Sequence, residues 1–368
     1  EFHYFSMRDL MTGPKSFDWS SIDEKLVVTQ SRGCQLVFRV IAEFPGRPRQ
    51  VPDFIVEQGV EITLWTDPDG NESHTPDYEH PTMRLALVDF IEALGSQYDG
   101  DPRVGYITAG LLGSWGEWHT HPREDLWASR ETQRLVLKAF ERTIEKTPVL
   151  LRYPAGEGSV SQSENVSLNF GYHDDSFNWA TLETGNPEDS WFFIPLLKNA
   201  GALEKWKTAP IGGEVRPELW DKSFTDNPHP RAQGFFDCVE ATHATWLMDT
   251  GLFSKRFPLS NERKAKAIKA AQTLGYEFFV SSCERAGEQL RLTVENTGVA
   301  PFYADWPVEL SNGDQVVKRF SLQGILPGEV KVWEAEIKAR VLFGFVCRIP
   351  WRVGGPFALP MRIKKEGG

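Results

Sequence analysis

The feature of this sequence that most constrains its fold is an alternation between apolar, strand-like segments and amphipathic helical segments. Eight strand-like segments occur in the first 275 residues, near positions 3–7, 35–42, 60–65, 103–107, 148–153, 166–170, 209–213 and 245–248. Helical spacing of apolar residues recurs between them, most clearly at 21–30, 84–97 and 131–146. The count and the length predict an α/β fold, with a (β/α)8 TIM barrel in residues 1–275.

The hydrophobic period changes after Gly275, from helical spacing to the alternation typical of antiparallel strands. Segments 290–294 and 330–333 alternate, and Asn312-Gly313 is a strong hairpin-turn signal. Residues 276–368 are therefore expected to form a small antiparallel β-sandwich domain. Cys283 and Cys347 both lie in this region and could pair, a question that the sequence leaves open.

The composition is ordinary for a globular protein and excludes some partners. The 368 residues carry a net charge of −11 without a long run of Lys and Arg, which argues against nucleic acid. No apolar run approaches the roughly 18 residues that span a bilayer, so we expect no membrane insertion. The sequence begins at Glu1 without a signal peptide; we expect a secreted or extracellular protein whose signal region has been removed.

The stretch from Arg103 to His121 contains the clearest candidate for catalytic chemistry. It begins as a buried strand and then becomes a Gly-rich turn that presents Glu117 between Trp115 and Trp118. Apolar walls favour the protonated form of a carboxyl group, which suits a general acid. Indole faces also offer flat apolar surfaces for sugar rings. The 13 tryptophans, many of them in Gly-, Asp- or Pro-containing segments, suit a carbohydrate ligand.

Polar and aromatic residues gather where the predicted barrel strands end, the place where a barrel enzyme has its active site. Glu117 follows the fourth predicted strand, and Glu214 follows the seventh. The expected substrate-binding residues at these ends are Arg8, Arg39, Trp65, Trp115, Trp118, His119, Tyr172, His173, Asp174, Arg216 and Trp246. Further charged residues at the same ends, to which we assign no role, are Asp9, Glu43, Arg152, Asp175 and Asp249.

Two motifs resemble those of the retaining glycoside hydrolases built on (β/α)8 barrels. They are Leu112-Gly-Ser-Trp-Gly-Glu-Trp-His119 and Pro210-Ile-Gly-Gly-Glu-Val-Arg216. The whole chain is also similar to uncharacterised microbial glycosidase-like proteins that have a GxWGEWH stretch, a GGE stretch and an appended β-domain. The resemblance implies that Glu117 is the acid/base and that Glu214 is the nucleophile.

One position departs from the pattern of that clan. Many members have Asn immediately before the acid/base Glu, where this chain has Gly116. His119 is then a candidate for contacting the sugar 2-hydroxyl. Retaining hydrolysis needs two carboxyl groups roughly 5 Å apart, one protonated and one ionised. A nearby Arg39 or Arg216 would keep Glu214 ionised, so we expect hydrolysis of an oligo- or polysaccharide without a cofactor or metal.

Two other functions stay open at this point. His119 and His121, at i and i+2 on an extended chain, could both ligate zinc, with His173 and Asp174 completing the site of a metal-dependent hydrolase. Alternatively, the barrel binds carbohydrate without cleaving it. The sequence indicates neither the sugar, the linkage nor the oligomeric state.

Overall fold

The structure, a computed structural model, describes residues 1–152, 154, 164–257, 259–312, 315–337, 343–347 and 362–363. The chain divides into two compact units. Unit 1 comprises Glu1–Ser176 and Ala180–Leu203, and unit 2 comprises Phe177–Trp179 and Glu204–Gly368. The predicted division at residue 275, into a catalytic domain and a β-sandwich domain, stays a prediction.

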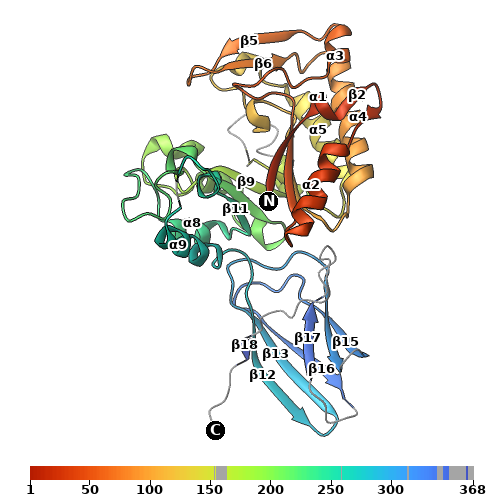
Figure 1. Cartoon of the computed structure of the whole chain (residues 1–368), viewed down its shortest axis with the longest axis vertical. Coiled ribbons are helices and arrows are strands. Elements are labelled where there is room, and N and C mark those ends of the chain that lie inside the picture. Colours follow the sequence, from red (N-terminus) through yellow and green to blue (C-terminus); the bar gives the residue numbers. More distant parts are fainter. Residues whose placement is uncertain are drawn as a thin grey trace. The chain divides into compact units, whose positions relative to one another are not determined.

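A parallel sheet of seven strands organises the first 250 residues (Figure 1). Its spatial order follows the chain: β1 (Phe2–Ser6), β4 (Leu36–Ile41), β7 (Val104–Thr108), β8 (Val149–Leu151), β9 (Phe170–Phe177), β10 (Ile211–Val215) and β11 (Trp246–Met248). The sheet is open, with β1 and β11 as its edges. The predicted closed (β/α)8 barrel is therefore wrong, and the fold is a mixed α/β half-barrel.

The third predicted strand, 60–65, lies outside this sheet. Ile62–Thr66 forms β5, which pairs antiparallel with β6 (Glu72–Pro76) in a hairpin. Strands of a parallel sheet are buried on both faces, whereas Leu64 in β5 is 60% exposed. The Asp67 carboxylate accepts hydrogen bonds from two backbone N–H groups of the turn, as Asp does in tight turns. Consequently Glu117 follows the third strand of the main sheet, and Glu214 lies in the sixth.

The sixth predicted strand, 166–170, is displaced along the chain. Asn165–Ser167 forms a 3-10 turn, and the strand is β9, in which every side chain is buried. The predicted strand-end residues at 172–174 are therefore inside the strand. Because side chains alternate along a strand, Asp175 shares a face with residue 173, while residues 172 and 174 face the other way.

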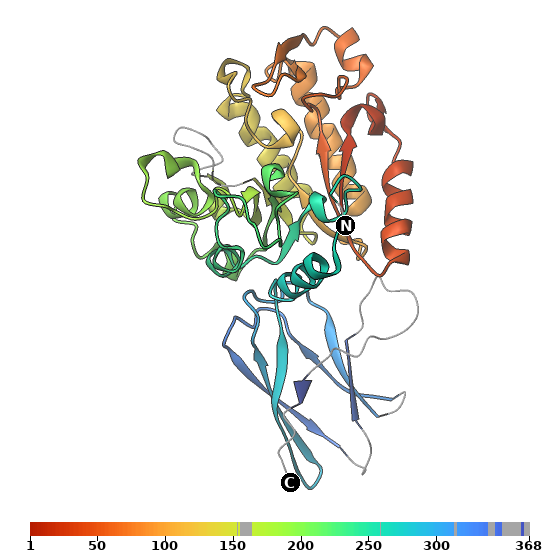
Figure 2. The same cartoon turned by 60° about the vertical axis from the view of Figure 1, so that its left-hand side comes forward.

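Helices connect the strands of the sheet and confirm three of the predicted helical segments. Figures 1 and 2 show α2, α4 and α5 running beside the strands of unit 1. The helices are α1 (Met7–Leu10), α2 (Ser20–Ser31), α3 (Asp53–Glu57), α4 (Pro81–Tyr98), α5 (Arg130–Thr143), α7 (Phe193–Asn199), α8 (Phe235–Thr242) and α9 (Asn261–Ala271). Short 3-10 turns occur at 114–116, 124–126, 187–191, 205–207, 217–219 and 250–252, and β2 (Met11–Gly13) pairs with β3 (Ser16–Phe17).

The C-terminal residues form two further sheets that share a hydrophobic core. One has the order β16 (Val330–Glu336), β13 (Gln289–Asn296), β12 (Phe278–Ala286) and β18 (Arg362–Ile363), and the other β15 (Gln315–Ser321), β14 (Pro307–Asn312) and β17 (Phe343–Cys347). Val294 from the first sheet and Leu310 from the second are both fully buried in that core. Cys283 has a free thiol, so the disulfide considered from the sequence is not formed.

Among the helices that the structure describes, none combines the length and the hydrophobicity required to cross a membrane.

Candidate functional site

The loop after β7 has an unusual concentration of left-handed backbone. Leu111, Trp115 and Trp118 have φ values of 70°, 55° and 58°, and Gly113 and Gly116 also have positive φ. A non-glycine residue in this region costs on the order of 1–3 kcal/mol and persists where the surroundings over-determine it, often at functional sites. The strain is concentrated in the turn that presents Glu117.

Arg39, in the middle of β4, is the buried cation that this loop surrounds. Its side chain is 2% exposed, and its Nη1 lies 3.3 Å from Oε1 of Glu117. The guanidinium also donates to Oγ1 of Thr108 at 3.2 Å and to the backbone oxygen of Trp115 at 3.3 Å. A buried guanidinium needs such partners. The loop therefore supplies Arg39 with both a carboxylate and a carbonyl acceptor.

Two glycines let the loop lie directly on the strand that carries Arg39. A Cβ on Gly110 would meet the backbone oxygen of Val40 at 2.0 Å and Cγ of Arg39 at 2.8 Å. A Cβ on Gly116 would lie 3.2 Å from Cδ of Arg39, in addition to its left-handed φ of +69°. The Gly spacing of this stretch is thus required by close backbone approach.

Asp175 on β9 places a second carboxyl group beside Glu117. Its side chain is 4% exposed, and its Oδ2 accepts a hydrogen bond from Nε of Arg152 at 2.5 Å. Burial raises the pKa of Asp175; the Arg152 guanidinium acts against this shift, and the charge of Glu117 adds to it. The protonated form of Asp175 is therefore favoured relative to an exposed aspartate.

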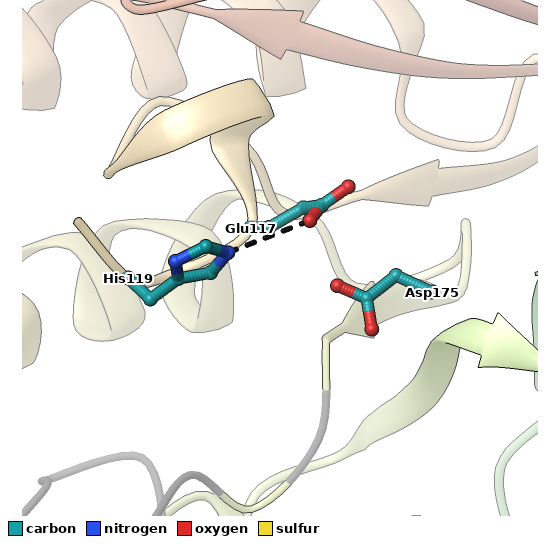
Figure 3. A group of neighbouring side chains, drawn as sticks. All are labelled: Glu117, His119 and Asp175. Carbon is teal, nitrogen blue, oxygen red and sulfur yellow. Dashed lines mark ion pairs between the residues drawn. The ribbon is translucent and has the colours of Figure 1, made fainter. Parts of the chain in front are cut away.

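His119 completes a cluster of three side chains that point toward one another (Figure 3). One potential ligand atom from each of Glu117, His119 and Asp175 lies within 4.8 Å of the others. His119 Nε2 is 3.6 Å from Oε2 of Glu117. Burial, followed by the charge of Arg152, lowers the pKa of His119 to about 3, so its ring is neutral at physiological pH.

The tautomer of His119 follows from its backbone contact. The N–H of His121 donates to Nδ1 of His119 at 3.2 Å, so Nδ1 is an acceptor. A neutral ring with Nδ1 as acceptor carries its hydrogen on Nε2, and this hydrogen is directed to Glu117. The ring of His121 itself is exposed and lies 2.9 Å from Oε1 of Glu124, so the predicted His119/His121 pair does not converge on one point.

A buried acid, Glu43, lies beneath the loop. It accepts hydrogen bonds from Oγ of Ser114 at 2.9 Å and from Oγ of Ser73 in the β5–β6 hairpin at 2.7 Å. Burial raises the pKa of Glu43. The adjacent Tyr78 hydroxyl accepts a hydrogen bond from the backbone N–H of Gly113 at 2.8 Å. The hairpin and the loop are thus joined through one carboxyl group.

The structure brings some of the predicted site residues together and not others. Arg39, Glu117 and His119 are in contact, and half-buried Trp115 lies with its ring 6.1 Å from that of His119. Trp118 is buried and donates from Nε1 to the backbone oxygen of Ala109, so it supports the loop. His173 is buried on the face of β9 that also carries the Asp175 side chain.

Other predicted residues of unit 1 have different surroundings. Tyr172 donates to Oδ1 of buried Asn165, and Asp174 accepts from Oγ1 of Thr181 at 2.6 Å. Arg8 is exposed and pairs with Asp53, and Trp65 donates to Thr75 within the hairpin. Glu214, Arg216 and Trp246 belong to unit 2, so the predicted separation of Glu117 and Glu214 stays a prediction.

Asp175 and Arg152 are the partners that sequence reasoning placed at strand ends without giving them a role. Charged residues at the end of a buried strand indicate that ion pairs form there, so the sequence did point to Arg152 and Asp175. The sequence does not give the register of β9, and this register decides that Asp175 rather than Asp174 faces Glu117.

Comparison with known proteins adds no family: no protein-family model matches the chain, and neither does any curated protein. The resemblance to retaining glycoside hydrolases rests on its motifs.

Proposed function

We propose that this protein is a retaining glycoside hydrolase in which Glu117 is the acid/base. The observation that carries the proposal is the carboxyl pair of Glu117 and Asp175, whose nearest oxygens lie within 4.8 Å at the carboxyl-terminal side of a parallel sheet. Sites in open α/β folds lie outside this edge of the sheet. Burial raises the pKa of Asp175, and the charge of Glu117 adds to this shift.

Exposure decides which member of the pair meets the substrate. The side chain of Glu117 is 14% exposed, whereas that of Asp175 is 4% exposed. Glu117 is therefore the group that donates a proton to the glycosidic oxygen and later activates water. Asp175 is a positioning residue, because it is buried beside Glu117 and held by Arg152. The neutral His119 directs its one ring hydrogen, on Nε2, to Glu117 and so orients that side chain.

The nucleophile in this proposal is Glu214, on the evidence of its sequence motif. Glu214 is 9% exposed in β10, and Arg216 follows two residues later. The substrate is an oligo- or polysaccharide, consistent with the half-buried Trp115 beside His119. No step requires a cofactor.

The experiment compares Glu117→Gln with Glu124→Gln, an exposed acid of the same loop. Glycosides with poor leaving groups need protonation as the bond breaks, so Glu117→Gln should lower their kcat/KM by about 10²–10⁴-fold. Aryl glycosides with activated leaving groups should lose much less in their first step. Glu124→Gln should leave both unchanged. Equal losses on both substrates would remove the acid/base role, and binding without any hydrolysis by the wild type would favour a carbohydrate-binding protein.

A metal-dependent hydrolase is the second candidate, because Glu117, His119 and Asp175 have the spacing of a three-ligand site. Two features oppose it. Ligation through Nε2 of His119 would require the ring hydrogen on Nδ1, which faces the N–H of His121. Arg39 and Arg152 already compensate the two carboxylates. Stoichiometric zinc in the purified protein, with activity lost to a chelator, would establish this candidate instead.

A further inference from the structure

A second group of side chains, within unit 2, gathers around Trp179 directly after β9. The guanidinium carbon of Arg231 lies 4.5 Å from the centre of the Trp179 ring, and that of Arg216 lies 5.9 Å from it. The ring of His229 is 5.0 Å away, tilted by 39°. One indole thus has two arginines and a histidine around it. We call these four residues the Trp179 cluster.

The cluster is held by backbone contacts. The N–H of Gln233 donates to the oxygen of Asn178 at 2.8 Å, and the Asn178 side-chain amide donates back to the oxygen of Gln233. The N–H of Arg231 donates to Nδ1 of His229 at 3.1 Å. Asn178 has a left-handed φ of 68°. These contacts fix the loop that carries Arg231 against the segment that carries Trp179.

The two arginines differ in their partners. Glu218 accepts from Nε and Nη2 of Arg216, at 2.8 and 3.0 Å, which fixes the plane of that guanidinium. Arg231 is exposed and forms no ion pair with any residue that the structure describes. Stacking on an indole orders a guanidinium plane while leaving its N–H edge available to a planar anion. Arg216 and Arg231 together carry two positive charges and Glu218 one negative charge, on a chain of net charge −11.

We propose that the Trp179 cluster binds the anionic group of an acidic saccharide, a uronate carboxylate or a sulfate ester. This inference rests on the proposed function and narrows its substrate class. Arg216 is two residues after the proposed nucleophile Glu214, at the carboxyl-terminal end of β10. Arg231 supplies a bidentate donor, Arg216 adds charge, and Trp179 keeps both in place. A neutral sugar lacks the negative charge that these guanidinium groups attract.

The test measures binding by calorimetry, so that it does not depend on catalysis. The protein is the full chain with Glu117→Gln, which prevents turnover. Its ligands are an oligouronate, a sulfated oligosaccharide and a neutral oligosaccharide of equal length. We expect the anionic ligands to bind at least about tenfold more tightly than the neutral one, and the preference to weaken as salt is added. A preference for carboxylate over sulfate, or the reverse, identifies which anion the cluster recognises.

Arg231→Ala should remove this preference, and Arg231→Lys should restore only part of it, because Lys lacks the planar fork. The matched control is Arg256→Ala, which removes an exposed guanidinium lying 5.3 Å over the Phe257 ring of the same unit. An equal loss in the Arg256 variant, or equal affinity for all three saccharides, would overturn the proposal. Anion binding that depends on Arg231 in a wild-type protein that cleaves no glycoside would instead overturn the proposed function alone.

Discussion

At the residue scale, the group formed by Glu117, His119 and Asp175 depends on Arg39, a buried cation of a kind that strands rarely contain. Arg39 lies among apolar neighbours in β4 and has Glu117, Thr108 and the carbonyl of Trp115 as partners. In the sequence, Arg39 is the exception in the apolar segment 35–42, and a buried guanidinium there is expected to need a carboxylate partner. Local sequence could not identify Asp175 as the neighbour of Glu117, because that contact depends on strand register.

Removing the guanidinium should destabilise the fold strongly. Arg39→Met leaves the Glu117 carboxylate and the Trp115 carbonyl without their donor, at a cost of about 3–5 kcal/mol in the free energy of unfolding. Arg47→Met is the matched control, since its guanidinium is exposed and stacks on Phe44, and should cost less than about 1 kcal/mol. Similar urea midpoints for both variants would show that Arg39 is not the support of the loop.

The carboxyl pair predicts a shift in the pH dependence of activity. Burial raises the pKa of Asp175, so Asp175 ionises at higher pH than an exposed aspartate. If Asp175 positions Glu117, its ionisation contributes to the pH profile of kcat/KM, and Asp175→Asn, which cannot ionise, should change that profile. Asp249→Asn is a control, because Asp249 is also a buried acid but bonds Ser223 in unit 2. A pH profile of kcat/KM that is the same in Asp175→Asn as in the wild type would remove the positioning role.

At the element scale, the sequence predicted helices better than it predicted the sheet. The segments 21–30, 84–97 and 131–146 are helical as expected, because a helix buries one face and its period shows in the sequence. Segment 60–65 was misassigned, because a short apolar run is compatible with a central strand or a hairpin. The Asp67-Pro-Asp-Gly turn was the signal that could have separated them.

The β5–β6 hairpin should support the loop through its hydrogen bonds to Glu43. Ser73→Ala removes a buried donor to that carboxyl group, which costs about 1–3 kcal/mol and loosens the segment that carries Glu117. Exposed Ser31 is the control, and Ser31→Ala should change stability by less than about 0.5 kcal/mol. Hydrogen exchange of residues 113–118 should speed up in the Ser73 variant only. Unchanged exchange there would argue against the hairpin as an anchor.

At the scale of the whole molecule, the number of predicted strands led to the wrong prediction of a closed barrel. Seven strands in sequential order form an open parallel sheet, because the hairpin does not enter it. Whether the edges of a sheet meet depends on shear and tilt, which no local pattern encodes. The change of period near Gly275 did locate the start of the C-terminal strands, since β12 begins at Phe278.

Buried acids give the molecule a distinctive pH dependence of stability. Burial raises the pKa of Asp174 to about 7, so the folded state holds a proton that the unfolded state releases near pH 4. The stabilisation is complete below pH 4 and is lost as pH rises through 7, by roughly 4 kcal/mol. Asp174→Asn should flatten this decline, whereas exposed Asp18→Asn should not. A decline of the same size in the Asp174 variant, measured by urea unfolding, would contradict the assignment.

The most direct test of the central claim is the anomeric configuration of the product that azide forms with the Glu117→Ala protein, followed by NMR on an activated aryl glycoside. If Glu117 is the acid/base, a covalent intermediate still forms on the nucleophile. Azide then attacks that intermediate without needing a general base, and the glycosyl azide retains the configuration of the substrate. A glycosyl azide of inverted configuration would contradict the account, because azide would then have taken the place of Glu117 as the nucleophile.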